Sequence, residues 1–141
     1  MRAILIDPKA QTVTEVDHAG GCESIYALVG CSTFTVIALA GRDVMYLDDE
    51  GLLFEGEKPA FTFGDYPQPL VGRGLIVSTD EMGEDVAADM SLAAATAATR
   101  WMEPLLVTGF VTERGRVHHP VLGELNAVRT RVVFAPPKVG E

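Results

Sequence analysis

Residues 25–53 constrain the fold more than any other stretch of this chain, and they read IYALVGCSTFTVIALAGRDVMYLDDEGLL. Apolar residues at helical spacing end at Gly30, and the β-branched run that follows predicts a strand over 33–39. The turn at 41–43 leads into a second predicted strand over 44–47, which ends in an acidic turn. This order of helix, strand, turn and strand specifies an architecture, but every polar group in it has a structural role that requires no active site.

Strand-like segments outnumber helical ones, and most are joined by connections of hairpin length. Such connections join antiparallel strands, so we expect an α+β fold with a mainly antiparallel sheet and two helices packed on it. The second helix is predicted over 92–101, with Ala94, Ala97, Ala98 and Trp101 on the side that faces the sheet. The other predicted strands cover 2–6, 12–16, 52–54, 70–78, 105–112, 117–122 and 128–134, with a long packed loop over 55–69 and a turn at 113–116.

The length and composition predict one cytoplasmic domain over residues 1–141. A chain of 141 residues with 48% hydrophobic residues can form one core. No apolar run approaches the roughly 18 residues of a membrane helix, and the N-terminus lacks the pattern of a signal peptide. Cys22 and Cys31 have neither a metal-binding spacing nor a disulfide framework, so we expect reduced structural thiols, no metal and no cofactor.

The charge of the chain is acidic and unevenly distributed. The formal net charge is −9, and residues 1–100 contain 16 acidic against 6 basic residues, whereas residues 101–141 contain 4 against 5. Affinity for nucleic acids comes largely from Lys and Arg side chains that neutralise phosphates. Direct binding to nucleic acid is therefore disfavoured.

The densest acidic segment contains Asp80, Glu81, Glu84 and Asp85, and it allows two interpretations. It could be an interaction patch that imitates DNA phosphates and occupies a DNA-binding protein. Alternatively, Ser78 and Glu81 form an S-x-x-E capping box at the start of a helix. Capping is favoured, because a DNA mimic needs acidic charge along the whole molecule. In the last third of the chain, acidic residues do not outnumber basic ones.

One cationic cluster lies in the C-terminal third and consists of Arg114, Arg116, His118, Arg129 and Arg131. Alternate strand residues share a face, so the last two arginines project together, and an exposed histidine could join them around a phosphate. The competing interpretation is a basic turn that balances an acidic protein, and it is favoured. His118 and His119 point to opposite faces of a strand, so they cannot both bind one metal ion.

Three glycine-marked motifs carry a family resemblance: Leu28-Val29-Gly30, the strand 44–47 entering Asp49-Glu50-Gly51, and Pro69-Leu70-Val71-Gly72 running into 75–77. In their order and spacing, residues 1–85 resemble an uncharacterised family of bacterial and phage proteins, domain of unknown function 3846. Residues 86–141, the second helix and the C-terminal strands, show no motif of that family. The resemblance implies a small cytoplasmic protein often carried by phages or mobile elements, without catalytic residues to transfer.

These observations favour a non-enzymatic cytoplasmic interaction or accessory protein, associated with phages or mobile elements, whose protein partner is unknown. No G-x-S-x-G, Walker, H-E-x-x-H or paired Cys–His motif occurs. The alternative is a protein that binds a small anionic ligand or a nucleotide phosphate through the Arg/His cluster, with or without weak hydrolysis. The sequence does not indicate the identity of the partner or ligand, or the oligomeric state.

Overall fold

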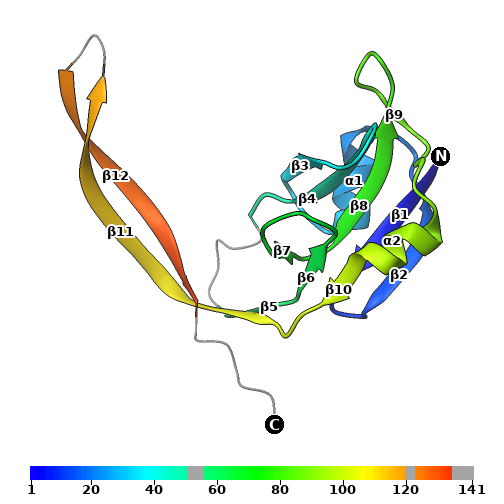
Figure 1. Cartoon of the computed structure of the whole chain (residues 1–141), viewed down its shortest axis with the longest axis horizontal. Helices are drawn as coiled ribbons and strands as arrows, with labels where there is room; N and C mark the ends of the chain where they lie inside the picture. The colour runs from blue at the N-terminus through cyan, green and yellow to red at the C-terminus, as the bar shows by residue number, and fades with distance from the viewer. Residues whose placement is uncertain (51–55, 120–122, 135–141) are drawn as a thin grey trace.

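The structure, a computed structural model, describes residues 1–50, 56–119 and 123–134, with side chains described up to residue 105. Its largest sheet has the strand order β2-β1-β8-β4-β3, with β9 paired to β8 at the end of the sheet (Figure 1). All of its neighbouring strands are antiparallel. The strands are β1 (Arg2–Asp7), β2 (Thr12–Asp17), β3 (Phe34–Ala38), β4 (Asp43–Asp48), β8 (Gly74–Thr79) and β9 (Asp85–Val86).

Two helices lie on opposite faces of this sheet (Figure 1). The first, α1 (Gly21–Val29), buries Ile25 and Val29 against Ala3, Leu75 and Val77. The second, α2 (Leu92–Ala98), buries Ala95 in the core of the other face, together with the isoleucines of β1 and β8. Since successive strand residues point to opposite faces, β1 and β8 contribute side chains to both cores.

A smaller sheet completes the core on the side of α2. It has the order β10-β6-β7, formed by β10 (Thr99–Trp101), β6 (Ala60–Phe63) and β7 (Leu70–Val71). Phe61, Phe63 and Leu70 are its buried side chains. Gly74 at the start of β8 permits this packing, because a Cβ there would lie 2.7 Å from Met45 Sδ and 3.1 Å from the Phe61 ring.

A long two-stranded ribbon extends away from the sheets and helices described above, which are called the body below (Figure 1). It consists of β11 (Leu105–His119) and β12 (Gly123–Phe134). At its base, β11 also pairs with β5 (Gly56–Lys58) through residues 105–107. Residues 109–119 and 123–133, which pair only with each other, are called the arm below.

The expected fold class is confirmed, but three local predictions were wrong. Residues 55–69 are not all loop, because they contain β5 and β6, whose partner strands are distant in the sequence. The turn predicted at 113–116 lies inside β11, where these residues pair with 126–129. The polar residues that suggested a turn also suit a ribbon that can be solvated on both faces.

The third wrong prediction concerns the second helix, which ends at Ala98 rather than Trp101. Trp101 belongs to β10, which pairs with β6. Ala95, not Ala94 or Ala97, is the buried alanine of the helix, and Ala98 is partly buried. The helix packs on the sheet as expected, but through a different set of residues.

Ala95→Glu should lower the free energy of unfolding by about 3 kcal/mol or more, because it places an unpaired carboxylate in the core. Urea unfolding of the two proteins measures the difference. Ala97→Glu is the matched control, since residue 97 is exposed on the same helix, and its effect should stay within about 0.5 kcal/mol. Equal effects of the two substitutions would contradict this placement of α2.

Candidate functional site

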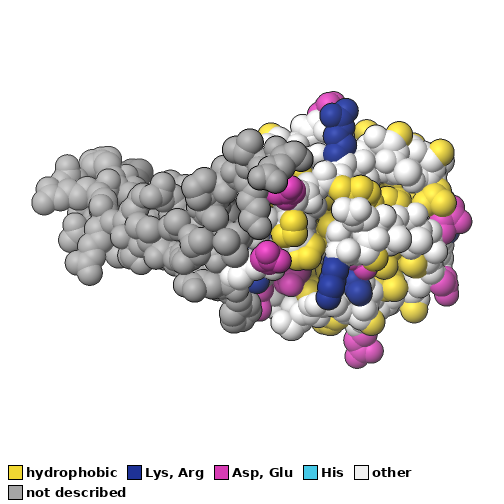
Figure 2. All heavy atoms as spheres, turned by 90° about the horizontal axis from the view of Figure 1, so that it is seen from below, with side chains coloured by type: hydrophobic (Ala, Val, Ile, Leu, Met, Phe, Trp, Pro, Cys, Tyr) yellow, Lys and Arg dark blue, Asp and Glu magenta, His cyan; other side chains and the backbone are white. Residues whose placement is uncertain are grey.

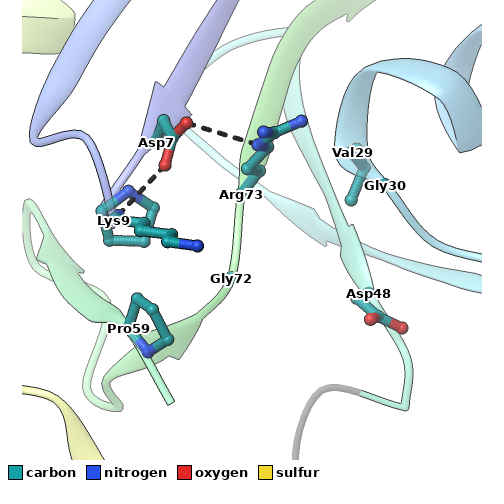
Figure 3. A pocket seen from close by; sticks show the side chains of 9 residues that line it. Asp7, Lys9, Val29, Gly30, Asp48, Pro59, Gly72 and Arg73 are labelled. Atoms are coloured by element: carbon teal, nitrogen blue, oxygen red, sulfur yellow. Dashed lines mark hydrogen bonds and ion pairs between the residues drawn. The ribbon is translucent and has the colours of Figure 1, made fainter. Parts of the chain in front are cut away.

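An open groove of about 320 Å³ lies where three connections of the sheet meet at one end of the body (Figure 3). It is lined by residues 7–9 of the β1–β2 turn, by the C-terminal end of α1 and by residues 72–73 between β7 and β8. Asp48 and Pro59 complete its wall. Pockets of about 300–1,000 Å³ are the usual size for small-molecule sites.

Asp7 organises the charged groups of this groove. Its Oδ1 accepts hydrogen bonds from the backbone N–H groups of Lys9 and Ala10, at 3.0 and 3.2 Å. Its Oδ2 lies 3.4 Å from Arg73 Nε, and the Asp7 side chain is only 17% exposed. Both carboxylate oxygens therefore have partners, and Asp7 fixes the turn and the guanidinium together.

The two cations of the groove present unused donors. Figure 3 shows the Lys9 side chain extending toward the middle of the groove and the Arg73 guanidinium directed toward the end of α1. Arg73 Nη1 lies 3.9 Å from the position of a Cβ at Gly30, the left-handed residue that caps α1. A cation at a helix C-terminus is stabilised by the partial negative charge there. Within the described residues, Lys9 Nζ has no ion-pair partner.

The groove unites the segments on which the family resemblance rests. Val29 and Gly30 belong to the first motif, residues 28–30. Asp48 lies between the strand 44–47 and the acidic turn of the second motif. Gly72 belongs to the third motif, where it ends residues 69–72. These segments are distant in the sequence, but the sheet order brings their ends to one place. Residues from all three of these segments therefore line the groove.

Cys31 lies beside this groove, in a neighbouring hollow that shares Gly30 and Asp48 with it. Burial raises the pKa of the Cys31 thiol, and the negative charge of Asp48 raises it further. Cys22, by contrast, is exposed. The two thiols therefore differ in their surroundings, and neither forms a disulfide.

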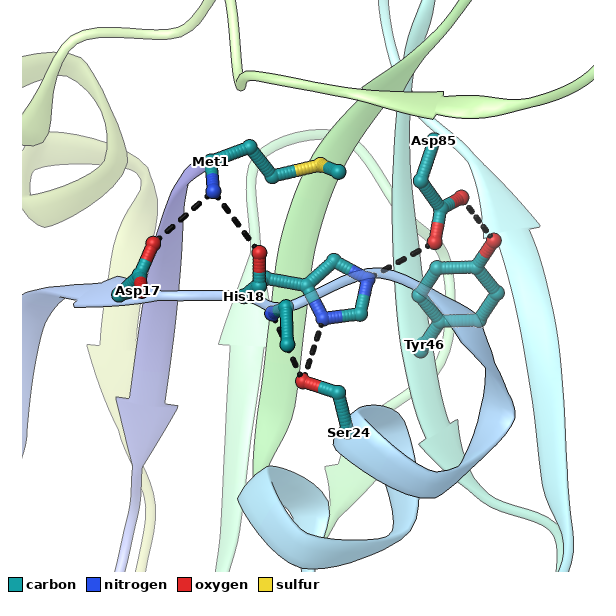
Figure 4. A network of polar contacts seen from close by, with 7 residues as sticks. Met1, Asp17, His18, Ser24, Tyr46 and Asp85 are labelled. Atoms are coloured by element: carbon teal, nitrogen blue, oxygen red, sulfur yellow. Dashed lines mark hydrogen bonds and ion pairs between the residues drawn. The ribbon is translucent and has the colours of Figure 1, made fainter.

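A second polar cluster, the His18 network, is centred on an imidazole that is 0% exposed (Figure 4). His18 Nε2 lies 2.9 Å from Asp85 Oδ2, and Nδ1 lies 2.8 Å from Ser24 Oγ. The Tyr46 hydroxyl donates to the other oxygen of Asp85 at 2.6 Å. The network joins α1 and the segment before it to β4 and to the start of β9.

The carboxylate of Asp85 sets the direction of the hydrogen bonds that it makes in the His18 network. As a carboxylate, Asp85 accepts from His18 Nε2–H, and the other ring nitrogen, Nδ1, shares a hydrogen bond with the Ser24 hydroxyl. A serine protease has the same order of groups, but here no substrate can reach the buried ring, and Ser24 Oγ also accepts from Ala19 N–H. Burial and Asp85 raise the pKa of Tyr46, which keeps its hydroxyl protonated as a donor. The buried imidazole therefore has a structural role, while Tyr46 and Asp85 also line a hollow of about 320 Å³.

The four residues of the predicted acidic patch lie around the turn between β8 and β9 and have different roles. Asp80 Oδ1 accepts from the N–H groups of Met82 and Glu84 and shapes the turn. Glu81 is 86% exposed, 3.8 Å from Arg42, and Glu84 is also exposed, whereas Asp85 belongs to the His18 network. Figure 2 looks at the molecule from below, away from this turn, and on that face the acidic side chains lie at several separate places.

The capping box expected at Ser78 and Glu81 was wrong, since Ser78 is a buried residue of β8. The residue that caps α2 is Ser91, whose hydroxyl accepts from Ala94 N–H at 3.0 Å. The sequence contains a serine at both positions. Only the packing of β8 against its neighbouring strands distinguishes the strand residue Ser78 from the helix cap Ser91.

The predicted cationic cluster lies in the arm, and its side chains are outside the described part of the chain. The backbone register places Arg129 opposite Glu113 and His118 opposite Glu124. It places Arg114 opposite Val128, Arg116 opposite Asn126 and Arg131 opposite Val111. The cluster is therefore distributed along both strands instead of around a turn.

Comparisons with known proteins agree with the family resemblance. The family model of DUF3846, a domain of unknown function, matches residues 1–98, and the chain belongs to this family. The uncharacterized protein y4iR of Sinorhizobium fredii (strain NBRC 101917 / NGR234) is 27% identical over 139 residues, which cover 96% of this chain and 86% of the relative. No solved structure shows significant similarity to this chain. In the described residues, no helix is long and apolar enough to cross a membrane.

Asp85→Ala should lower the free energy of unfolding by about 1–3 kcal/mol, because it leaves the buried His18 Nε2 and the Tyr46 hydroxyl without an acceptor. Thermal or urea unfolding measures the effect. Glu84→Ala, at the neighbouring exposed acid, is the control and should change stability by no more than about 0.5 kcal/mol. If the two variants are equally stable, the network does not hold the β8–β9 turn.

Alkylation of Cys31 by iodoacetamide should reach half of its maximal rate at a higher pH than alkylation of a free thiol, because only the thiolate reacts and a raised pKa delays its formation. Mass spectrometry of the Cys31 peptide follows the rate. Asp48→Asn removes one cause of the raised pKa and should shift the midpoint to lower pH. Asp49→Asn, at an exposed neighbour, should leave it in place; an unshifted midpoint in both variants would exclude the contribution of Asp48.

Proposed function

We propose that this protein is a non-enzymatic interaction protein that binds a protein partner through its arm. The observation that carries this proposal is the unpaired outer edge of each arm strand within the described residues. Beyond residue 107, β11 pairs only with β12. A two-stranded ribbon by itself is marginally stable in water, whereas its edges offer rows of N–H and C=O groups to another chain.

The sequence of the arm changes along its length in a way that suits this role. Near the body, the register pairs apolar residues with each other, such as Val107 with Phe134 and Phe110 with Val132. Farther out, it pairs residues of opposite charge, such as Glu113 with Arg129. Strand addition to a sheet edge obtains affinity from main-chain hydrogen bonds and specificity from side chains, and this arm offers both.

The alternative of a phosphate site in the Arg/His cluster has less support. Two of its five residues, His118 and Arg129, have glutamates as register partners, and opposite charges across an antiparallel pair attract each other. A cytoplasmic location and an association with phages or mobile elements belong to the same proposal and rest on the sequence.

A shortened variant tests the role of the arm. Deleting residues 113–129 and joining Thr112 to Thr130, which are register partners, through Asn-Gly leaves a short hairpin with a favourable turn. The body keeps its core, so its unfolding temperature should change by only a few degrees. Affinity capture from host lysate with the intact chain should retain a protein that the shortened chain loses.

The exposed acid Glu81 provides the control, because Glu81→Gln leaves the arm intact and should capture the same protein as the unaltered chain. Loss of the partner with Glu81→Gln alone would assign binding to the acidic turn. Sedimentation of the purified chain identifies the case in which the partner is a second copy. Capture that is identical for the intact and shortened chains would overturn the proposal.

A further inference from the structure

We infer that the groove between the β1–β2 turn and the end of α1 binds a phosphate group of a small molecule through Lys9 and Arg73. This inference is independent of the proposed role of the arm, because it rests on a different part of the molecule. The sequence alone did not indicate it, since the two cations are far apart in the chain and each is a single basic residue in its own segment.

The first support is that the guanidinium is held in place before any ligand arrives. Asp7 binds Arg73 Nε through one oxygen, and its other oxygen is fixed by two backbone N–H groups of the turn. Holding a binding group in position reduces the entropy lost when a ligand binds. Arg73 is still 46% exposed, so its terminal nitrogens remain accessible.

The second support is the set of accessible hydrogen-bond donors inside the groove, which also contains the carboxylates of Asp7 and Asp48. Asp7 has no free oxygen, and Asp48 lies across the groove from Lys9 and accepts from Glu50 N–H (Figure 3). The accessible donors thus come from Lys9 and Arg73. A phosphate presents several acceptor oxygens to these two donors at once, whereas a single carboxylate presents two.

The third support is the space around the cations. Val29, Pro8 and Pro59 supply apolar wall next to the polar groups. Gly30 and Gly72 adopt positive φ angles of 75° and 76°, and no side chain at these two positions fills the groove. A small-molecule site commonly combines such apolar walls with a few polar groups that fix orientation.

The test is a titration of the full chain with inorganic phosphate, at constant ionic strength, followed by backbone ¹H–¹⁵N chemical shifts. We expect the amide signals of Lys9, Gly30 and Gly72 to move along one saturating curve. Acetate, a single carboxylate, should move them only at much higher concentration. No movement up to millimolar phosphate, or movement confined to arm residues 114–131, would overturn the inference.

Substitutions connect the signals to the two cations. Lys9→Gln and Arg73→Gln should each weaken phosphate binding about tenfold, the usual cost of losing a hydrogen bond to a charged group. Arg42→Gln is the matched control, because Arg42 is 60% exposed and lies outside the groove. Lys9 is exposed, and its side chain makes no ion pair within the described residues, so its variant keeps the test valid if Arg73→Gln does not fold. Equal weakening by the Arg42 variant would reduce the effect to general electrostatics and exclude the site.

Discussion

The burial of β1 and β8 on both faces is the constraint on which the rest of the structure depends. A strand that is covered on both sides needs an apolar layer against each face, and here α1 supplies one layer while α2 and the small sheet supply the other. β8 pairs with β1, β4 and β9, so it holds the sheet together laterally as well. Gly74 lets Met45 and Phe61, which both belong to the core on the side of α2, approach the backbone at the start of this strand.

The polar groups of the body are placed where these central strands end. Asp7 is the last residue of β1, and Arg73 immediately precedes β8, so the groove is built from the ends of two adjacent strands. The His18 network lies at the other end of β8, where Asp85 begins β9. Both clusters contain a carboxylate with two partners, and both Asp7 and Asp85 lie at the edge of a hollow. They differ in the partner of the carboxylate, which is a buried imidazole for Asp85 and a half-exposed guanidinium for Asp7.

Local patterns in the sequence predicted the elements whose signals are local. Gly30 ends α1 in a left-handed conformation, as the spacing before it indicated, and the β3–β4 hairpin follows the β-branched and turn residues around Gly41. Elements that depend on distant partners were missed: β5 and β6 are three and four residues long and exist because β11 and β10 pair with them. The groove and the His18 network were missed for the same reason, since each joins side chains from separate segments and leaves no short motif.

The family match covers residues 1–98 and ends with α2, just before the chain leaves the body toward the arm. Only the short pairing of β5 with residues 105–107 and the strand β10 connect these two parts of the described chain. Beyond residue 107 the strands of the ribbon pair only with each other in the described chain, so a change in the length of the ribbon there leaves the strand pairing of the body intact.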